Sequence, residues 1–147
     1  MNERYLFRGK RKDGQGWIEG DLVHTRTTTQ GVATEIYTLD MSYEVDPETV
    51  GQCTGLKDKN GKLIFEGDII VTDIFNTPEI KYTIAYNKEI ATFIGEYRKG
   101  CIKYFTTFDG DSNCFEVIGN IHDNPNLLKI EHDSLCETET YKAGDEE

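Results

Sequence analysis

The stretch TGLKDKNGKLIFEGDII, residues 54–70, combines a polar loop, an Asn-Gly pair, an apolar triplet and a Glu-Gly-Asp sequence. Asn60 and Gly61 are the residues that a type I′ turn favours, because both central positions of that turn need positive φ angles. The pair therefore predicts a hairpin between its two flanking segments. Gly67 allows a second sharp change of direction, and Asp68 can accept hydrogen bonds from backbone N–H groups where the next strand begins. Two strands at an angle result, which is how small barrels turn a corner.

The same order of parts occurs earlier in the chain, in RGKRKDGQGWIEGDLV, residues 8–23. Each stretch has a glycine, a charged loop with a second glycine, two bulky apolar residues and then Glu-Gly-Asp. Two copies are too few for a solenoid, which needs about three or more repeats. We interpret the echo as one local device that the fold uses twice.

The two acidic pairs, Glu19 with Asp21 and Glu66 with Asp68, also suggest a chemical alternative. Residues two apart share a face of a regular strand, so each pair could hold a cation or perform acid–base chemistry. The glycine between the two acids implies a bend, however, and the surrounding spacing does not match a calcium loop. The sequence favours a structural role over a metal site, and it leaves open whether the two pairs converge in space.

Alternation of apolar and polar residues predicts short strands along most of the chain. The clearest example is 80–86, in which Ile80, Tyr82, Ile84 and Tyr86 share one face. Similar stretches lie at 17–24, 32–39, 48–54, 68–74, 90–97, 102–108 and 115–121. Eight or more short strands separated by turns predict a β-barrel or a β-sandwich.

One segment predicts a helix, because Asn124 suits an N-cap and Pro125 suits the first helical position. We expect one or two turns there, covering one end of the sheet. Two polar segments between strands, 25–29 and 109–113, predict exposed hairpin tips.

Length and composition fit one β-rich domain. The chain has 147 residues, and its 16 threonines and 14 isoleucines far outnumber its 4 alanines, a bias that suits strands. No apolar run approaches the roughly 20 residues that cross a bilayer, and no signal peptide is recognisable, so we expect a soluble chain without membrane contact. We predict one β domain over residues 1–130 and a flexible acidic tail over residues 131–147.

Charge is unevenly distributed along the chain, whose net charge is −11. Residues 131–147 contain seven acidic residues and one lysine, which is typical of a solvated tail. The first twelve residues instead contain five cations and one acid, and their cations are Arg4, Arg8, Lys10, Arg11 and Lys12. This cluster could contact phosphate, but a solvated edge is the simpler interpretation, since nucleic acid repels an acidic chain.

Motifs of common catalytic and metal sites are absent from the sequence. The four cysteines, Cys53, Cys101, Cys114 and Cys136, form no C-x-x-C and are expected to be free thiols in a reducing cytoplasm. The three histidines lack metal-site spacing, and no phosphate-binding glycine motif or nucleophile elbow is present. We therefore predict no catalytic residue, no metal site and no cofactor. Seven aromatic residues could stack on bases, although packing is the default role for Trp17, Tyr37, Tyr43, Tyr82, Tyr86, Tyr97 and Tyr104.

Three segments together resemble the YopX family of phage and prophage proteins: RYLFRGKRKDGQGWIEGD near the N-terminus, QCTGLKDKNGKLIFEGDII at 52–70, and FEVIGNIHDNPNLL at 115–128. The resemblance spans about residues 4–128. It implies a small, mainly β fold, a partly open barrel of short antiparallel strands with one or two short helical segments. The motif positions that carry over have structural rather than catalytic explanations; they are Thr54, Gly55, Leu56, Asp58, Gly61, Glu66, Gly67, Asp68, Phe115, Val117, Ile118, Gly119, Asn120, Asn124 and Pro125.

The resemblance implies no settled function. We expect a non-enzymatic, cytoplasmic phage or prophage accessory protein that binds an unknown phage or host protein and forms homo-oligomers through sheet edges or hairpin tips. One alternative is a nucleic-acid-related protein, either a direct binder, which the charge disfavours, or an acidic decoy that captures host DNA-binding proteins. A second alternative is a metal-dependent enzyme that uses the Glu and Asp pairs.

Overall fold

Strands dominate the computed structural model, which describes residues 2–29, 31–72, 80–99, 102–107 and 114–129. Within these ranges, ten strands and two 3-10 helices follow one another as η1 (Glu3–Tyr5), β1 (Phe7–Arg11), β2 (Trp17–Thr27), β3 (Gly31–Tyr37), β4 (Ser42–Lys57), β5 (Leu63–Phe65), β6 (Asp68–Thr72), β7 (Lys81–Asn87), β8 (Thr92–Lys99), β9 (Ile102–Thr107), β10 (Phe115–Asn120) and η3 (Pro125–Leu128). The mainly β prediction is confirmed.

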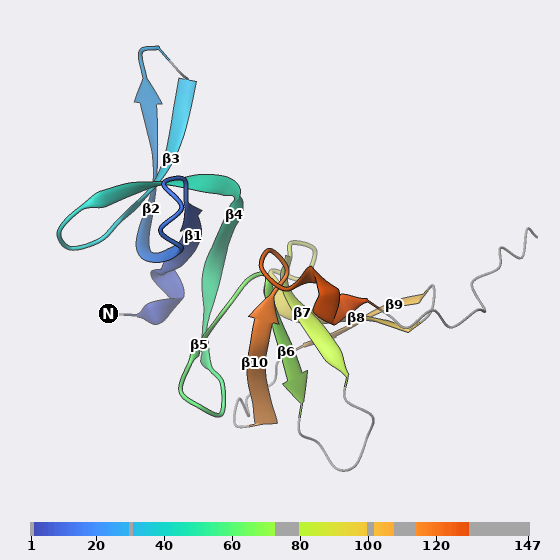
Figure 1. Cartoon of the computed structure of the whole chain (residues 1–147). Coiled ribbons are helices and arrows are strands. Elements are labelled where there is room, and N and C mark those ends of the chain that lie inside the picture. Colours follow the sequence, from blue (N-terminus) through green and yellow to red (C-terminus); the bar gives the residue numbers. More distant parts are fainter. Residues whose placement is uncertain (1, 30, 73–79, 100–101, 108–113, 130–147) are drawn as a thin grey trace, which may run out of the picture.

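The strands form two antiparallel sheets, which Figure 1 shows side by side. In the first sheet the order is β1-β2-β3-β4-β5, and an additional pairing of β1 with β4 closes four strands into a ring. The second sheet is open, with the order β10-β6-β7-β8-β9. A closed ring beside an open sheet confirms the predicted small, partly open barrel.

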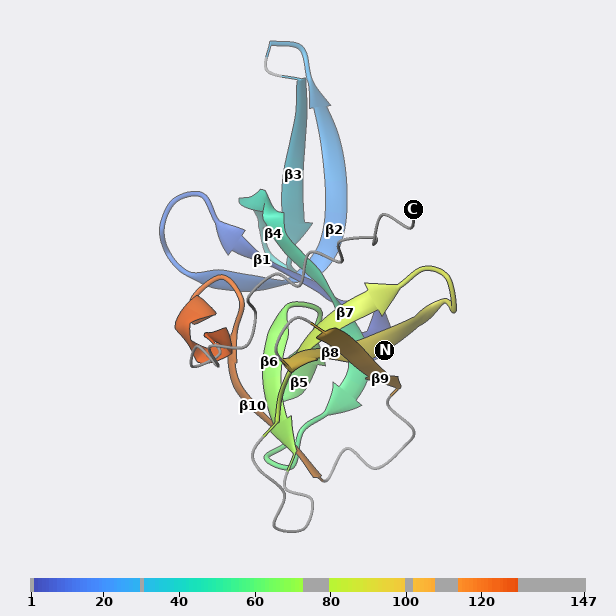
Figure 2. The same cartoon turned by 90° about the vertical axis from the view of Figure 1, so that its right-hand side faces the viewer.

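A two-stranded ribbon projects from the ring in both views (Figures 1 and 2). The first part of β2, up to Gly20, pairs with β1, whereas residues from Asp21 to Thr27 pair only with β3. We call residues 21–29 and 31–41 the arm; it comprises the outer part of β2, all of β3 and the turn into β4. Gly20 marks its base, where a Cβ atom would lie 2.1 Å from the carbonyl oxygen of Tyr37.

The hairpin at residues 58–62 differs from the predicted type I′ turn. Gly61 has a φ of 82°, but Asn60 does not have a positive φ. The Gly61 N–H donates to the Asp58 carbonyl at 2.9 Å, and the Asp58 N–H donates to the Lys62 carbonyl at 2.8 Å. These bonds define a type I turn followed by a glycine bulge, a common alternative for three-residue hairpin loops.

The two echoed stretches share their hairpin loop but differ at Glu-Gly-Asp. In the loops, Gly14 and Gly61 both have a positive φ, and their N–H groups donate to the carbonyls of Arg11 and Asp58 at 3.3 and 2.9 Å. Gly67 has a φ of 86° and lies in the turn between β5 and β6, whereas Gly20 has no positive φ and lies inside the continuous strand β2. The predicted bend between Glu19 and Asp21 is therefore absent. Position 20 requires glycine because there is no space for a side chain, and position 67 requires glycine because its backbone adopts a positive φ.

The hydrophobic core lies where the β4–β5 hairpin packs on the second sheet. Ile64 of β5, Ile70 of β6 and Ile84 of β7 are buried at its centre. Partly buried apolar side chains surround them, namely Leu56, Tyr82, Phe93, Phe115 and Val117. Alternation along β7 places Ile84 in this core and leaves Tyr86 exposed, so only part of the predicted apolar face is covered.

Several strand boundaries differ from the sequence prediction. The patterns did not predict β1 as a strand, and they predicted only a part of the 16-residue β4. The segments 109–113 and 131–147 lie outside the described residues, and the division into one domain over residues 1–130 and a tail stays a prediction. Among the residues that the structure describes, no helix has the length and apolarity to span a bilayer.

Candidate functional site

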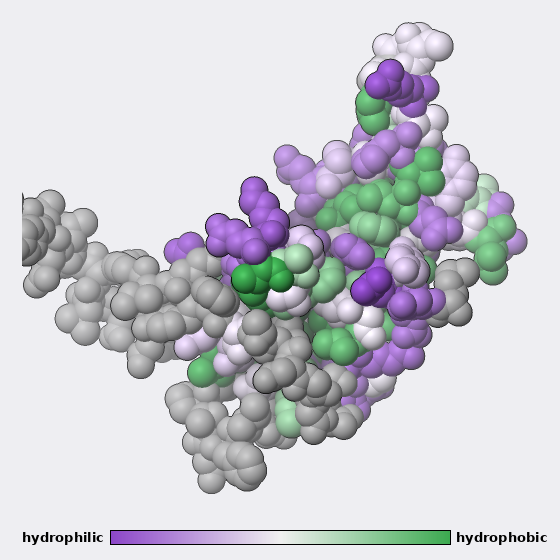
Figure 3. Space-filling view, turned by 180° about the vertical axis from the view of Figure 1, so that it is seen from behind, coloured by the Kyte–Doolittle hydropathy of each residue, from purple (hydrophilic) through white to green (hydrophobic). Residues whose placement is uncertain are grey.

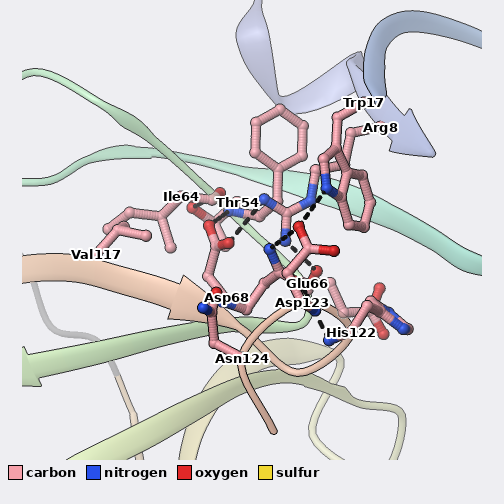
Figure 4. A network of polar contacts seen from close by, with 12 residues as sticks. Arg8, Trp17, Thr54, Ile64, Glu66, Asp68, Val117, His122, Asp123 and Asn124 are labelled. Carbon is pink, nitrogen blue, oxygen red and sulfur yellow. Dashed lines mark hydrogen bonds and ion pairs between the residues drawn. The ribbon is translucent and has the colours of Figure 1, made fainter. Parts of the chain in front are cut away.

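The three motif-bearing segments meet at one junction between the two sheets (Figure 4). Its centre is an ion pair between Nη1 of Arg8, on β1, and Oδ1 of Asp68, on β6, at 2.7 Å; the two side chains are 9% and 1% exposed. The guanidinium also lies over the rings of Trp17 and Phe65, at 4.9 and 5.0 Å from their centroids. Arginine suits this position because its planar group can stack on rings and bind a carboxylate at once.

Asp68 connects this ion pair to the turn that precedes it. Its Oδ2 accepts a hydrogen bond from the backbone N–H of Phe65 at 2.8 Å, which confirms the bonding predicted from the sequence. Burial raises the pKa of Asp68, and the nearby Arg8 guanidinium opposes that rise only in part. The carboxylate is therefore committed to the packing of β1 against β6 and is closed to solvent.

Asp123 forms a second connection between the sheets. Its carboxylate accepts hydrogen bonds from Nζ of Lys10 and Nε1 of Trp17, both at 2.7 Å, and from Nδ2 of Asn120 at 3.2 Å. These bonds, with that from Lys10 the strongest, lower the pKa of Asp123 to about 2. Trp17 also contacts the ring of His122, at 5.8 Å between centroids. The segment after β10 is thus tied to β1 and β2.

The turn from β10 into η3 explains two further motif positions. Oδ1 of Asn120 accepts hydrogen bonds from the N–H groups of His122 and Asp123 at 3.0 and 2.9 Å. Asn124 precedes η3 and Pro125 begins it, as predicted, but the Asn124 side chain does not cap the helix. It points back to accept the Asn120 N–H at 3.3 Å, and a Cβ on Gly119 would lie 2.6 Å from it.

Asp58 covers the outer edge of β10. Its Oδ1 accepts the N–H groups of Asn60 and Lys62, both at 2.9 Å, and its Oδ2 accepts the N–H of Val117 at 3.1 Å. Burial alone would raise the pKa of Asp58, but these backbone hydrogen bonds outweigh it and lower the pKa. The Lys59 N–H also donates to the Phe115 carbonyl at 2.8 Å. A side chain and one backbone amide thus replace a neighbouring strand, which is one way to protect a sheet edge.

Replacing Asp58 with alanine should lower the free energy of unfolding by about 2 kcal/mol, because three backbone N–H groups lose their acceptor. Urea unfolding followed by the fluorescence of the single tryptophan, Trp17, measures this change. Asp46→Ala is the matched control, since the exposed Asp46 carboxylate accepts one N–H, from Glu48 at 3.1 Å. Equal losses in the two variants would contradict the edge-covering role.

The remaining motif positions also have structural roles. Thr54 donates its hydroxyl to the Ile64 carbonyl at 2.9 Å, and Gly55 has a φ of 82°. Gly67 links two strands, because its N–H donates to the Ile84 carbonyl at 2.8 Å and its carbonyl accepts the Ile121 N–H at 2.9 Å. Ile118 lies at a register shift of β10, between the pairs formed by Val117 and Gly119. Glu66 contributes its backbone carbonyl, which accepts from Arg8 Nη2 at 3.3 Å.

The two acidic pairs have different surroundings. Glu19 and Asp21 are exposed on β2, whereas Asp68 is buried against Arg8. Within the described part of the chain, no group of three or more His, Cys, Asp or Glu side chains is arranged to hold a metal ion. The geometry therefore offers the metal-dependent alternative no ligand set there.

The N-terminal cations are mostly engaged within the protein. Arg8 pairs with Asp68 and Lys10 with Asp123, while Arg11 and Lys12 form ion pairs with Asp13 and Glu44. The interpretation of this cluster as a solvated edge is wrong for Arg8, which is buried between two aromatic rings. Sequence reasoning missed this role because the partner, Asp68, lies 60 positions away along the chain.

Several large apolar side chains of the arm are exposed. Ten large hydrophobic side chains are exposed in the described part of the chain, and five of them lie on the arm, namely Val23, Val32, Tyr37, Leu39 and Met41. Leu39 is 102% exposed and Met41 is 60% exposed. Hydrophobic side chains are visible along the arm and beside its base in Figure 3. Leu39 and Met41 both lie in the turn that follows β3, whereas Val32 lies opposite Arg26 near the tip of the ribbon, so the turn is the strongest candidate for a contact surface.

These features define a small, mainly β protein with a ring, an open sheet, a polar junction between them and a projecting arm. A family model described as YopX protein matches residues 6–129, so the chain belongs to the YopX family. Among solved structures, protein EF1440 from Enterococcus faecalis is similar to this chain, with a TM-score of 0.47 and 23% sequence identity. That match covers 85% of this chain and 97% of the other. The comparison with curated proteins gives no match.

Proposed function

We propose that this chain is a non-enzymatic accessory protein of a phage or prophage that acts in the host cytoplasm by binding another protein through the arm. The carrying observation is the exposure of apolar side chains on the arm, above all Leu39 and Met41 at the turn between β3 and β4. Apolar side chains that leave water on association supply the main favourable term in protein binding. The partner would be a phage protein, a host protein or another copy of the chain.

The polar side chains of the junction are engaged in contacts within the protein, whereas several apolar side chains of the arm are exposed. Asp68, Asp123 and Asp58 all accept hydrogen bonds from groups within the protein, so these carboxylates are engaged in holding the fold. The cations Lys10 and Arg8 are likewise paired with acids, which weakens the case for direct nucleic-acid binding through the N-terminal cluster. Capture of a basic DNA-binding protein by the arm would fit the acidic-decoy version of the same proposal.

A comparison of tagged variants in a bacterial host tests the proposal. We expect the double variant Leu39→Ser/Met41→Ser to retain no more than about one-tenth of the partner protein that co-purifies with the wild type. The two substitutions make two apolar anchor residues polar, and such anchors carry most of the binding energy of an interface. Ile90→Ser is the matched control, since Ile90 is 51% exposed but precedes β8 in the other sheet. Quantitative mass spectrometry of the eluates measures the loss.

Two outcomes would contradict the arm as the binding surface. In one, the double variant retains the same proteins as the wild type; in the other, Ile90→Ser loses them equally. Circular dichroism of all three proteins shows that the variants remain folded, which the exposure of the substituted side chains leads us to expect.

A further inference from the structure

One edge of the arm has backbone hydrogen-bonding groups that no strand among the described residues covers. The Arg11 N–H donates to the Gly16 carbonyl at 2.8 Å, which closes the β1–β2 hairpin. Backbone groups alternate between the two edges of an antiparallel strand, so the even-numbered residues of β2 face β1. The other hairpin agrees: the Thr38 N–H donates to the Met41 carbonyl at 2.8 Å, so even residues of β3 face β4 and odd residues face β2.

This alternation leaves three residues of β2 without a strand on their outer side. Strand β1 ends its pairing at Gly20, so the N–H and C=O groups of Leu22, His24 and Arg26 point to an edge that no described strand covers. His24 and Arg26 are exposed. The opposite edge of the arm is shorter, because only Val32 and Thr34 of β3 face outward beyond the pairing with β4, and Thr34 is only 9% exposed.

We propose that this edge of β2 pairs with the same edge of a second copy, antiparallel and about a two-fold axis at His24. The inference rests on the proposed function and names its partner. A strand pair must join residues that face each other, so the axis at His24 places Leu22 opposite Arg26 of the second copy. The three outward-facing residues of each copy then all have hydrogen-bond partners.

Charge disfavours most contacts between two copies but permits one at this edge. Each chain has a net charge of −11, so most pairings of two copies would bring acids together. The segment 22–26 contains no acidic residue, and its single cation, Arg26, would face Leu22 of the other copy instead of another cation. The exposed Val23 would lie opposite Thr25 of the other copy, which covers part of its apolar surface.

The architecture of the arm supports the same partner. A two-stranded ribbon alone is marginally stable in water, and three or more strands are usually needed. Pairing β2 with its copy makes a four-stranded sheet of β3, β2 and their two equivalents. An unprotected edge is also a liability that a symmetric, closed pairing removes.

Like charges at the two-fold axis provide the test. In His24→Glu, two carboxylates would be directly opposite across the strands, which destabilises a pair. His24→Gln is the matched neutral control, and both variants lose the contact of His24 Nδ1 with Thr34 Oγ1 at 3.3 Å. We expect sedimentation equilibrium to give a dimer for the wild type and His24→Gln, and a molar mass lower by about two-fold for His24→Glu.

Cysteine cross-linking supplies a second readout. His24→Cys would place two thiols next to each other at the axis, and oxidation should then give a covalent dimer. Val32→Cys is the control on the other strand of the arm, where Val32 is 62% exposed but far from the axis. Its cross-linking should not exceed that of the wild type, whose own cysteines set the background.

A wild type that is monomeric at all concentrations would overturn the inference, and so would equal cross-linking of the two cysteine variants. Either result would leave the proposed function standing if the Leu39→Ser/Met41→Ser variant still loses a captured protein. The opposite combination is also distinguishable. If His24→Glu dissociates the wild-type dimer but the Leu39→Ser/Met41→Ser variant captures the same proteins as the wild type, this inference holds and the proposed function fails.

Discussion

Replacing Asp68 with alanine will lower the free energy of unfolding by about 3–5 kcal/mol, which is the usual cost of leaving one partner of a buried ion pair behind. The guanidinium of Arg8 would remain 9% exposed between two aromatic rings with no carboxylate within reach of Nη1. Its Nε has no hydrogen-bond partner among the described residues, so the protein has little means of compensating. The Phe65 N–H would also lose its acceptor.

Urea unfolding monitored by Trp17 fluorescence measures this loss directly at the junction, because the indole lies over Arg8. The double variant Arg8→Met/Asp68→Ala is the informative control. Methionine keeps an unbranched apolar chain between the rings but removes the buried charge, so the double variant should be more stable than Asp68→Ala alone. The single variants Arg8→Met and Asp68→Ala each lower the free energy of unfolding by a certain amount. If the double variant lowers it by the sum of these two amounts, the two side chains are not coupled and the ion-pair account is wrong.

Local features of the junction were predictable from the sequence, but its long-range contacts were not. The turn at Gly67 and the bonding of Asp68 to a backbone N–H follow from short-range chemistry, and both are confirmed. The ion pair of Arg8 with Asp68 depends on how two sheets meet, which alternation within a strand does not determine. A cation at the start of a strand is exposed in most proteins, so Arg8 gave no signal of its burial.

The turn at residues 58–62 shows a local prediction that failed for a local reason. Asn-Gly favours type I′, but Asp58 is two positions before Asn60 and its carboxylate accepts the N–H groups of Asn60 and Lys62. That arrangement stabilises a type I turn with a positive φ at Gly61 alone. An Asp two residues before Asn-Gly is therefore a signal that sequence analysis can use.

The echo between the two stretches holds for their loops but fails at Glu-Gly-Asp, because the order of residues does not reveal which copy is buried. Asp68 lies under β1 and binds Arg8, whereas Asp21 begins the arm and is exposed. The two glycines also serve different needs, since Gly67 adopts a positive φ and Gly20 is limited by space. The two Glu-Gly-Asp sequences thus have different structural roles.

Replacing Gly20 with alanine should lower the free energy of unfolding by about 3 kcal/mol, at the upper end of the usual cost of overpacking. The new methyl carbon would lie 2.1 Å from the carbonyl oxygen of Tyr37 and 3.1 Å from Cγ2 of Ile36. A flexible side chain could move away, but the Tyr37 carbonyl belongs to the backbone of β3, so the two strands must separate at the base of the arm.

Gly14→Ala is the matched control for this change, because Gly14 has a φ of 78° but no atom within 4 Å of an added Cβ. Its loss should be about 1 kcal/mol and arise from backbone strain alone. Hydrogen exchange separates the two causes: Gly20→Ala should speed exchange of the arm amides more than those of β6 and β7, whereas Gly14→Ala should leave the arm unchanged. If Gly20→Ala speeds amide exchange equally in both sheets, the contact at Gly20 supports the whole fold and does not act at the arm alone. The arm would then not be an independent unit for binding.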